Sequence, residues 1–338
     1  MKTIFDAADL GNLHLKNRVI RSATWEALAK SDGGPTDEQL SIYEELAKGG
    51  IGLIITGFTS VDRHDNYFSG MARLSSDDLI PCWAKLAEIS HAQNVPVIMQ
   101  LAMGEFVRRG RDAEPDDLSL EDVNEVIALF GDAARRAKEA GYDGVQIHAA
   151  HNFYLSRFIS PAYNHRTDAY GGHGGQGKIL VDILKDMRGK APGLHITMKI
   201  NCSDFMPGGL TPEQAIDTIK MMEEAGLDSV EISGNGTSVS GIRPGVNEAY
   251  YLSFAKELKK VSRLPLILVG GHRSIESMNR IVDEDGIEFL SISRPLVREP
   301  DLLNRWQNGD TMPAKCVSCN ACYSTPGHRC IFVLRGMG

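Results

Sequence analysis

The sequence has no run that approaches the roughly 18 consecutive apolar residues needed to cross a bilayer. Its first residues, MKTIFDAADLGNLHLKNR, also lack the apolar segment of a signal peptide. Positive charge is in deficit, because 36 Lys and Arg side chains stand against 44 Asp and Glu, for a formal net charge of -8. This balance argues against a nucleic acid or an anionic membrane as the main partner. We therefore expect a cytoplasmic protein with no membrane or nucleic-acid partner.

Cysteine is scarce except near the end of the chain, where Cys316, Cys319, Cys322 and Cys330 make up four of the six cysteines. Without a secretion signal, such a cluster indicates metal or redox chemistry rather than a disulfide scaffold. The rest of the composition, 42% hydrophobic and 24% charged, is that of a soluble globular protein. The 338 residues are enough for one large core or for two average domains.

Short apolar stretches rich in β-branched residues recur along the chain, and each is followed by a segment with helical periodicity. Three connections from helix to strand have similar sequences, in which a glycine ends the helix: EAGYDGV, EAGLDSV and DEDGIEF. Eight such units predict an α/β fold of the (β/α)8 TIM barrel type, with an open doubly wound sheet as the alternative. The predicted strands are residues 18–23, 52–56, 95–101, 144–148, 195–200, 229–232, 266–269 and 288–292.

Residues 4–15 have hairpin character, and residues 36–48 have the pattern of the first helix. We expect one barrel domain at residues 1–312, with the hairpin at its start, and a cysteine-rich tail at residues 313–338. The assembly that we expect is a homo-oligomer.

The connections that follow the strands are long, whereas those that precede them are short. In a barrel, the long connections all lie at the carboxyl ends of the strands, which is where such folds build their sites. Polar residues at the strand ends point to the same face: Thr24, Gln100, His148, Lys199 and Ser233. For any one of them a buried, hydrogen-bonded structural role is an equal alternative.

A phosphate site is predicted after the last two strands, where LVGGHRS and SISRP occur. Gly270 and Gly271 leave backbone N–H groups open at the start of a helix, and Arg294 follows the final strand. A tight turn with a surface arginine is the alternative. A cofactor bound there would reach Gln100, whose amide can pair with a flavin pyrimidine, and Lys199, which can neutralise charge on the reduced ring. This chemistry suits FMN.

The residues also resemble a known family. The stretch DGVQIHAAHNFYLSRFISPAYNHRTDAYGG, together with NRVIRSAT, MKINCSDFMPGGLTPEQAI, VGGHRS and SISRPLVREPDL, is similar to the old yellow enzyme family of FMN-dependent ene-reductases. The resemblance covers nearly the whole predicted barrel. It implies a TIM barrel that binds FMN, is reduced by NADH or NADPH and passes hydride from flavin N5 to an α,β-unsaturated carbonyl compound.

The resemblance also implies roles for individual residues. His148 and His151 would donate hydrogen bonds to the substrate carbonyl, and Phe58 would narrow the pocket at the ring edge. The group at Asn164, Arg166, Asp168 and Tyr170 would be structural. The residues implied to bind FMN are Ser22, Ala23, Thr24, Gln100 and Lys199 around the ring, and Gly270, Gly271, Ser293 and Arg294 at the phosphate.

One departure from the family concerns the proton donor. Many relatives have a tyrosine two residues after the second histidine, and here that position is Phe153. The donor could be the adjacent Tyr154, which we include among the candidate catalytic residues, or water, or there could be none. Without a donor, the flavin would reduce oxygen, quinones or free flavin instead of alkenes.

The tail resembles the iron–sulfur segment of the longer dienoyl-CoA reductase branch, with different spacing between its cysteines. Cys316, Cys319, Cys322 and Cys330 could hold a [4Fe–4S] cluster or a zinc ion, or they could be reduced thiols.

The leading hypothesis is an FMN-dependent NAD(P)H oxidoreductase that reduces activated alkenes, with small electrophiles as its partners. Three alternatives stay open. They are a diaphorase, NADH oxidase or amine demethylase without an efficient proton donor; a non-flavin barrel that binds phosphate as a sensor; and an aldolase that uses Lys199 as a Schiff-base amine.

Overall fold

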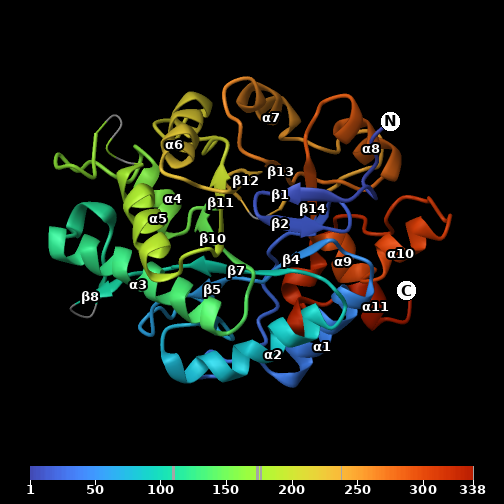
Figure 1. Ribbon diagram of the computed structural model, residues 1–338, viewed down its shortest axis with the longest axis horizontal. Coiled ribbons are helices and arrows are strands. Elements are labelled where there is room, and N and C mark those ends of the chain that lie inside the picture. The colour runs from blue at the N-terminus through green and yellow to red at the C-terminus, as the bar shows by residue number, and fades with distance from the viewer. Residues whose placement is uncertain (109–110, 173–174, 176, 237, 338) are drawn as a thin grey trace.

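The computed structural model describes residues 1–108, 111–172, 175, 177–236 and 238–337. Eight parallel strands lie at its centre (Figure 1). They pair in the order β10–β11–β12–β13–β14–β3–β4–β7, and β7 also pairs with β10, which closes the ring. The closed (β/α)8 barrel is therefore confirmed over the open sheet. The barrel strands are β3 (Val19–Arg21), β4 (Leu53–Ile55), β7 (Val97–Ala102), β10 (Gly144–Ala149), β11 (His195–Asn201), β12 (Ser229–Ser233), β13 (Leu266–Leu268) and β14 (Phe289–Ile292).

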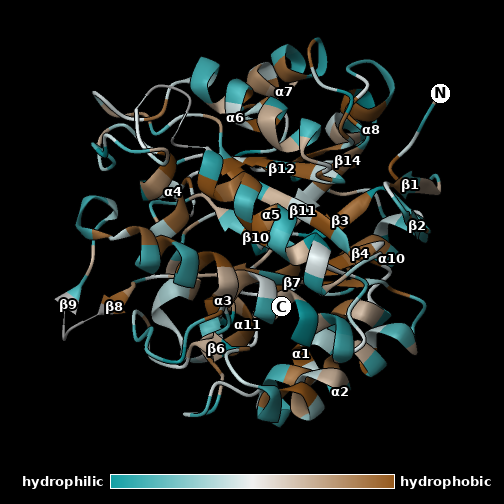
Figure 2. Cartoon of the chain, turned by 60° about the vertical axis from the view of Figure 1, so that its left-hand side comes forward, coloured by the Kyte–Doolittle hydropathy of each residue, from teal (hydrophilic) through white to brown (hydrophobic). Residues whose placement is uncertain are grey.

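Helices surround the strands, and the hydropathy of the chain explains the arrangement (Figure 2). The strands are buried along their whole length, whereas the helices alternate between apolar and polar residues. Side chains start several of the helices: Thr36 accepts a hydrogen bond from the backbone of Gln39 at the start of α1. The helices are α1 (Asp37–Lys48), α2 (Ile80–His91), α3 (Leu120–Glu139), α4 (Tyr154–Ile159), α5 (Lys178–Lys190), α6 (Pro212–Glu224), α7 (Leu252–Lys259), α8 (Ile275–Asp283), α9 (Arg294–Arg298), α10 (Leu302–Gln307) and α11 (Ile331–Leu334).

The expected N-terminal hairpin is present as β1 (Ala8–Leu10) and β2 (Leu13–Leu15), which pair antiparallel. Leu10 and Leu15 are fully buried in a cluster with residues from the barrel strands, among them Phe289. The hairpin therefore closes one end of the barrel, the end at which the strands begin.

The other end carries the long connections, which contain short elements of their own. The short strands here are β5 (Thr59–Ser60), β6 (Ala72–Arg73), β8 (Val107–Arg108) and β9 (Arg111–Asp112). Single 3₁₀ turns lie at Asp77–Leu79, Pro115–Asp117, Ala321–Ser324 and Pro326–His328. None of the described helices is long and apolar enough to cross a membrane.

The tail lies against the barrel rather than apart from it. The backbone N–H of Ala314 donates to the carbonyl of Arg273 at 2.8 Å, and that of Lys315 donates to the Glu299 carboxylate at 2.6 Å. Farther along, His328 Nδ1 lies 2.7 Å from the carbonyl oxygen of Trp25. These contacts bring the tail to the carboxyl end of the barrel.

Candidate active site

A cavity of about 220 Å³ lies at the carboxyl end of the strands. It brings together most of the side chains that the sequence singles out. The lining residues are Ala23, Thr24, Trp25, Phe58, Phe68, Gln100, His148, His151, Phe153, Lys199, Ser293, Arg294, Val297, Cys322, Tyr323 and His328. Of the predicted site residues, Ser22, Tyr154, Gly270, Gly271, Cys316, Cys319 and Cys330 do not line this cavity.

Lys199 reaches the cavity from β11 and is held in place by the strand beside it. It is the register partner of Glu231 on β12, and both side chains point into the barrel, with Nζ 3.2 Å from Oε1. Glu231 also accepts hydrogen bonds from the hydroxyls of Ser22 and Ser291, each at 2.7 Å, and Lys199 Nζ donates to Ser22 Oγ at 2.8 Å. Burial alone would raise the pKa of Glu231, but the Lys199 charge and these hydroxyls hold the pKa below its usual value. The carboxylate is therefore ionised and fixes the position of the lysine.

The same carboxylate sets the orientation of Gln100. Gln146 Nε2 donates to Glu231 Oε2 at 2.9 Å, and a carboxylate can only accept, so the Gln146 oxygen must face the other way. That oxygen accepts from Gln100 Nε2 at 2.8 Å. Gln100 Oε1 accepts no hydrogen bond from the described residues, and the side chain lines the cavity. Gln100 thus offers a free carbonyl oxygen to a ligand.

His148 and His151 lie at the end of β10 with their ring centroids 5.1 Å apart. Burial, and then the positive charge of Lys199, lower the pKa of His148 to about 3. Burial, followed by the neighbouring His148 and Lys199, lowers the pKa of His151 well below its usual value. Both imidazoles are therefore neutral near pH 7. His148 Nδ1 is buried and has no hydrogen-bond partner among the described residues, which is uncommon for a buried polar atom.

Aromatic rings form one wall of the cavity. Phe153 contacts His148 and Phe58 with ring centroids 5.1 Å away in both cases. Phe68 lies 5.7 Å from Phe153 and 4.3 Å from Trp25. The predicted narrowing by Phe58 is thus part of a larger aromatic wall, which Trp25 and Phe68 extend.

Tyr154 points away from the cavity. Its hydroxyl donates to the carbonyl oxygen of Ala113 at 3.0 Å, and burial raises its pKa above the usual value. Phe153 occupies the wall instead and has no proton to give. The structure therefore does not bring Tyr154 to the site, although the two residues are adjacent in sequence.

The phosphate end contains two buried arginines. Arg294 Nη1 donates to the carbonyl of Val239 at 2.8 Å and to the side-chain oxygen of Asn320. Arg273 donates to Ser318 Oγ at 2.7 Å and to the carbonyl of Cys316 at 3.1 Å. Within the described residues neither guanidinium forms an ion pair with a carboxylate. Two such cations in one region leave positive charge for an anion to neutralise.

Gly270 and Gly271 have φ angles of 141° and 84°, so this turn depends on glycine. A Cβ on Gly271 would lie 2.9 Å from a carbon of the Tyr250 ring. The Tyr250 ring thus packs against Gly271, and a side chain at this position would clash with it.

The four tail cysteines line a separate small cavity of about 20 Å³, which also touches Arg294 and Asn320. Among the residues that the structure describes, no group of three or more His, Cys, Asp or Glu side chains is placed to hold a metal ion. Cys322 also borders the larger cavity, together with Tyr323 and His328. The tail therefore completes a wall of the candidate site.

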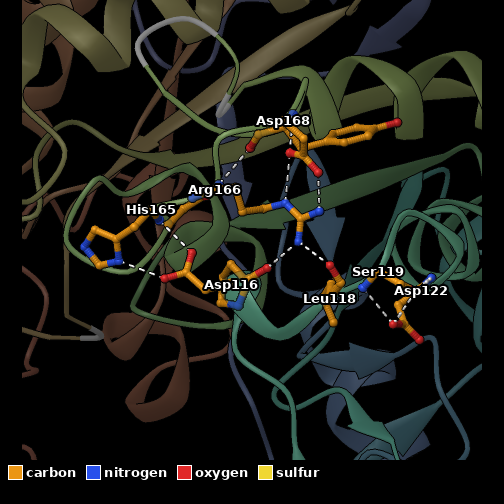
Figure 3. Close-up of polar contacts among 10 residues, drawn as sticks. Asp116, Leu118, Ser119, Asp122, His165, Arg166 and Asp168 are labelled. Atoms are coloured by element: carbon orange, nitrogen blue, oxygen red, sulfur yellow. Dashed lines mark hydrogen bonds and ion pairs between the residues drawn. The ribbon is translucent and has the colours of Figure 1, made fainter.

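The group that follows the histidines is structural, as expected (Figure 3). Arg166 donates to the carbonyls of Pro115 and Leu118 at 2.8 Å and 2.6 Å, and its Nε donates to Asp168 at 3.1 Å. Asn164 donates to the carbonyl of Tyr170 at 2.9 Å. These bonds hold the connection after β10 against the connection after β7.

Several contributors to the site carry no local signal in the sequence. Glu231 and Gln146 lie within apolar strands and matter only because the barrel closes around them. Arg273 stands in the LVGGHRS motif, but its partners lie in the tail. Trp25 and His328 meet across 303 positions of the chain.

The residues of the cavity fit FMN. Gln100 offers an acceptor and Lys199 a positive charge, both of which a flavin pyrimidine can use. Arg294 in the cavity lining supplies positive charge for a phosphate, and the buried Arg273 outside this lining adds to it. His148 and His151 line the same cavity, where they can bind a substrate oxygen.

Comparison with known proteins gives one family. The model of the NADH:flavin oxidoreductase / NADH oxidase family matches residues 3–116 and 102–312. The chain is 31% identical to an NADPH dehydrogenase of Listeria welshimeri over 316 residues, which cover 89% of this chain and 93% of the relative. It is 29% identical to a metal reductase of Desulforamulus reducens, covering 95% of this chain but 51% of the relative, so it spans about half the length of that protein.

Among solved structures, an old yellow enzyme homologue from Zymomonas mobilis superposes with a TM-score of 0.76 at 20% identity. The match covers 94% of this chain and 95% of the homologue. At this identity the likeness supports the barrel fold.

Proposed function

Because the chain belongs to the NADH:flavin oxidoreductase / NADH oxidase family, it is an FMN-dependent oxidoreductase, and we propose that its acceptor is an activated alkene such as an α,β-unsaturated carbonyl compound. The observation that carries this proposal is the pair of neutral imidazoles that line one cavity with Gln100 and Lys199, where His148 Nδ1 has no hydrogen-bond partner among the described residues. A neutral N–H donor suits a carbonyl oxygen that becomes negative during the reaction.

When bound, FMN supplies hydride that originates from NADH or NADPH. Gln100 and Lys199 bind and orient its ring, Lys199 by holding positive charge beside it. Ala23, Thr24 and Phe58 line the same cavity, and Ser22 is hydrogen-bonded to Lys199. Ser293 and Arg294, with Gly270 and Gly271, would hold the phosphate. His148 and His151 hold the substrate oxygen and stabilise the enolate that forms when the β-carbon receives hydride.

The α-carbon must then receive a proton. Phe153 cannot supply it, and the Tyr154 hydroxyl already donates its hydrogen bond to the carbonyl oxygen of Ala113. We propose water as the donor, because the cavity is open to solvent at its mouth. Changing Tyr154→Phe should then leave enone turnover within about twofold of the wild type, whereas a catalytic tyrosine would cost on the order of 100-fold.

The experiment that tests the function is the visible spectrum of the purified protein under anaerobic conditions. A flavin band should bleach with NADH or NADPH and return when cyclohexenone is added. His148→Ala combined with His151→Ala should keep FMN and lose at least tenfold in enone turnover, since one such donor contributes on the order of 3 kcal/mol. Unchanged turnover in this variant would remove the histidines from the mechanism.

A diaphorase is the second candidate, and the missing tyrosine favours it. In this case the flavin would bleach but return only with oxygen, a quinone or another electron acceptor. The similarity to a metal reductase is consistent with such an acceptor.

A [4Fe–4S] cluster or a zinc ion on the four tail cysteines is a separate proposal. It is supported by the single cavity that all four cysteines line, and it is opposed by the lack of a metal-holding group among the described residues. Analysis of iron, sulfide and zinc in anaerobically purified protein decides it. Iron and sulfide in equal amounts indicate a cluster, zinc alone indicates a zinc site, and neither indicates reduced thiols.

A further inference from the structure

The backbone at His151 has an unusual conformation. His151 and Asn152 have φ angles of 65° and 62°, so two successive residues with side chains lie in the left-handed region. Such residues cost free energy and persist only where their surroundings hold them. The conformation turns the chain sharply after β10 and places the second imidazole beside the first.

Asn201, at the end of β11, holds this turn. Its side-chain nitrogen donates to Asp204 Oδ1 at 3.0 Å, and because a carboxylate only accepts, this bond fixes which way the amide points. The amide oxygen is thereby directed at His151, whose backbone N–H donates to it at 3.0 Å. Asp204 is itself fixed by the backbone N–H of Leu210, at 2.8 Å.

Ser233, at the end of β12, holds the ring. Its Oγ lies 2.8 Å from His151 Nε2, and Ser233 is the register partner of Asn201. The residue is 3% exposed and does not line the cavity, so its hydroxyl proton reaches neither bulk solvent nor a bound ligand.

The direction of this hydrogen bond follows from the need of a buried hydroxyl to donate. Among the described residues, His151 Nε2 is the only acceptor with which Ser233 Oγ forms a hydrogen bond. Nε2 must then carry the lone pair. A neutral imidazole has one N–H, so the proton lies on Nδ1. Nδ1 makes no hydrogen bond to the described residues, and the ring borders the cavity.

We propose that Ser233 and Asn201 are positioning residues that fix His151 as the Nδ1–H tautomer, so that His151 binds the substrate oxygen through Nδ1. The inference rests on the proposed function for the identity of the ligand but not for the tautomer. Ser233 sets the proton on the ring, and Asn201 sets the backbone from which the ring projects. Without Ser233 the ring could place its proton on either nitrogen, and a fraction of the molecules would present a lone pair to the substrate oxygen.

The test is ¹⁵N NMR of FMN-loaded protein labelled selectively at histidine, with the His151 signals assigned by their loss in His151→Asn. In the wild type we expect a protonated Nδ1 and an unprotonated Nε2. In Ser233→Ala the two nitrogens should show averaged or reversed shifts, and in Ser233→Thr, which keeps the hydroxyl, the wild-type pattern should remain. A wild-type ring protonated at Nε2, or a Ser233→Ala pattern equal to the wild type, would overturn the proposal.

A binding measurement tests whether Ser233 and Asn201 affect the affinity for an oxyanion ligand. 4-Nitrophenolate carries an oxyanion like that of the enolate, and its Kd can be read by absorbance without turnover. We expect a Kd at least threefold higher in Ser233→Ala and in Asn201→Ala, and an unchanged Kd in Ser233→Thr. Equal Kd values in all four proteins would overturn the positioning role.

The two measurements separate this inference from the proposed function. If the protein bleaches and reoxidises only with oxygen, the alkene proposal fails while the NMR result stands. If enone turnover depends on both histidines but the His151 tautomer is the same in Ser233→Ala as in the wild type, the function stands and this inference fails.

Discussion

Lys199 and Glu231 place opposite charges inside the barrel, with side chains 3% and 0% exposed and 3.2 Å between Nζ and Oε1. A buried pair of this kind contributes little by itself, because the loss of hydration offsets the attraction, but removing one partner leaves an uncompensated charge. The pair should therefore respond very differently to one substitution and to two.

We predict that Lys199→Met lowers the free energy of unfolding by about 3 kcal/mol, since Glu231 is then a lone buried carboxylate. Lys199→Met with Glu231→Gln should recover more than half of this loss. Urea denaturation of the wild type, both single variants and the double variant measures the coupling. FMN retention should fall in both variants that lack Lys199. A double variant no more stable than Lys199→Met would contradict this account of the pair.

Lys199 and Glu231 also show which individual residues of the site can be predicted from the sequence alone. Lys199 lies one residue from the end of the predicted strand 195–200, and polar residues near strand ends are expected to point to the site, so its place is predictable. Glu231 has the same place in the predicted strand 229–232, but the sequence does not show which side chains it meets there. Its role depends on three partners from other strands and on Ser22, which follows β3, and the closed ring brings all four within 3.2 Å.

The start of α8 links two loops at the phosphate end of the site. Glu248 accepts hydrogen bonds from the backbone N–H and the hydroxyl of Ser274, both at 2.7 Å, and from the backbone N–H of Arg273. Its other contact, with the backbone N–H of Gly245 at 3.0 Å, closes its own loop. The carboxylate thus satisfies N–H groups that would otherwise have no partner at a helix N-terminus.

We predict that Glu248→Ala lowers the free energy of unfolding by about 2 kcal/mol, because several charge-assisted hydrogen bonds at the helix start are lost. Glu248→Gln, which keeps an acceptor oxygen but no charge, should lose about half as much. Hydrogen exchange should quicken in α8 before it does in the barrel strands. Equal exchange in α8 and unchanged stability would show that the loops hold without this contact.

At the scale of elements, the long and periodic parts of the chain are predictable. All eight barrel strands occur where the apolar stretches predict them, and Thr36 begins α1 as the pattern of residues 36–48 indicates. The short elements of the connections, such as β5 with two residues and α4 with six, have too few residues for a periodic signal. They form because the surrounding loops pack on them.

Across the whole molecule, buried histidines make stability depend on pH. Burial lowers the pKa of His195 and of His272 to about 4, and burial together with Lys199 lowers that of His148 to about 3. Below about pH 6.5 these histidines are protonated in the unfolded chain but stay neutral in the folded protein. Each of them therefore lowers the free energy of unfolding as the pH falls. Glu26 acts in the opposite direction, because burial raises its pKa to about 7 despite the nearby Arg21.

We predict that the free energy of unfolding falls by several kcal/mol between pH 7 and pH 4.5, since each of the three histidines accounts for about 2.5 kcal/mol between its unfolded pKa of about 6.5 and pH 4.5. Glu26 offsets part of this, because its own contribution is lost as the pH rises from about 4.5 to 7. Glu26→Gln should therefore steepen the loss on acidification. Urea midpoints at pH 7, 6 and 5 for both proteins test the sign, and a stability that rises on acidification would refute it.

The closed barrel also explains why the tail could not be placed from its sequence. Its partners, among them Trp25, Arg273 and Arg294, follow three different barrel strands, β3, β13 and β14, which come together only when the ring is complete. A cysteine pattern predicts chemistry but not which surface the segment covers.

The position of Trp25 has an optical consequence. Of the three tryptophans, Trp25 lines the cavity, whereas Trp83 and Trp306 do not, and these two donate their indole N–H groups to backbone carbonyls at 2.8 Å and 2.9 Å. Oxidised flavins absorb where tryptophan emits, so a ring seated in the cavity would quench the fluorescence of Trp25 most strongly. The protein carries its own indicator of cofactor loading, which can be read in seconds on an apoprotein titrated with FMN.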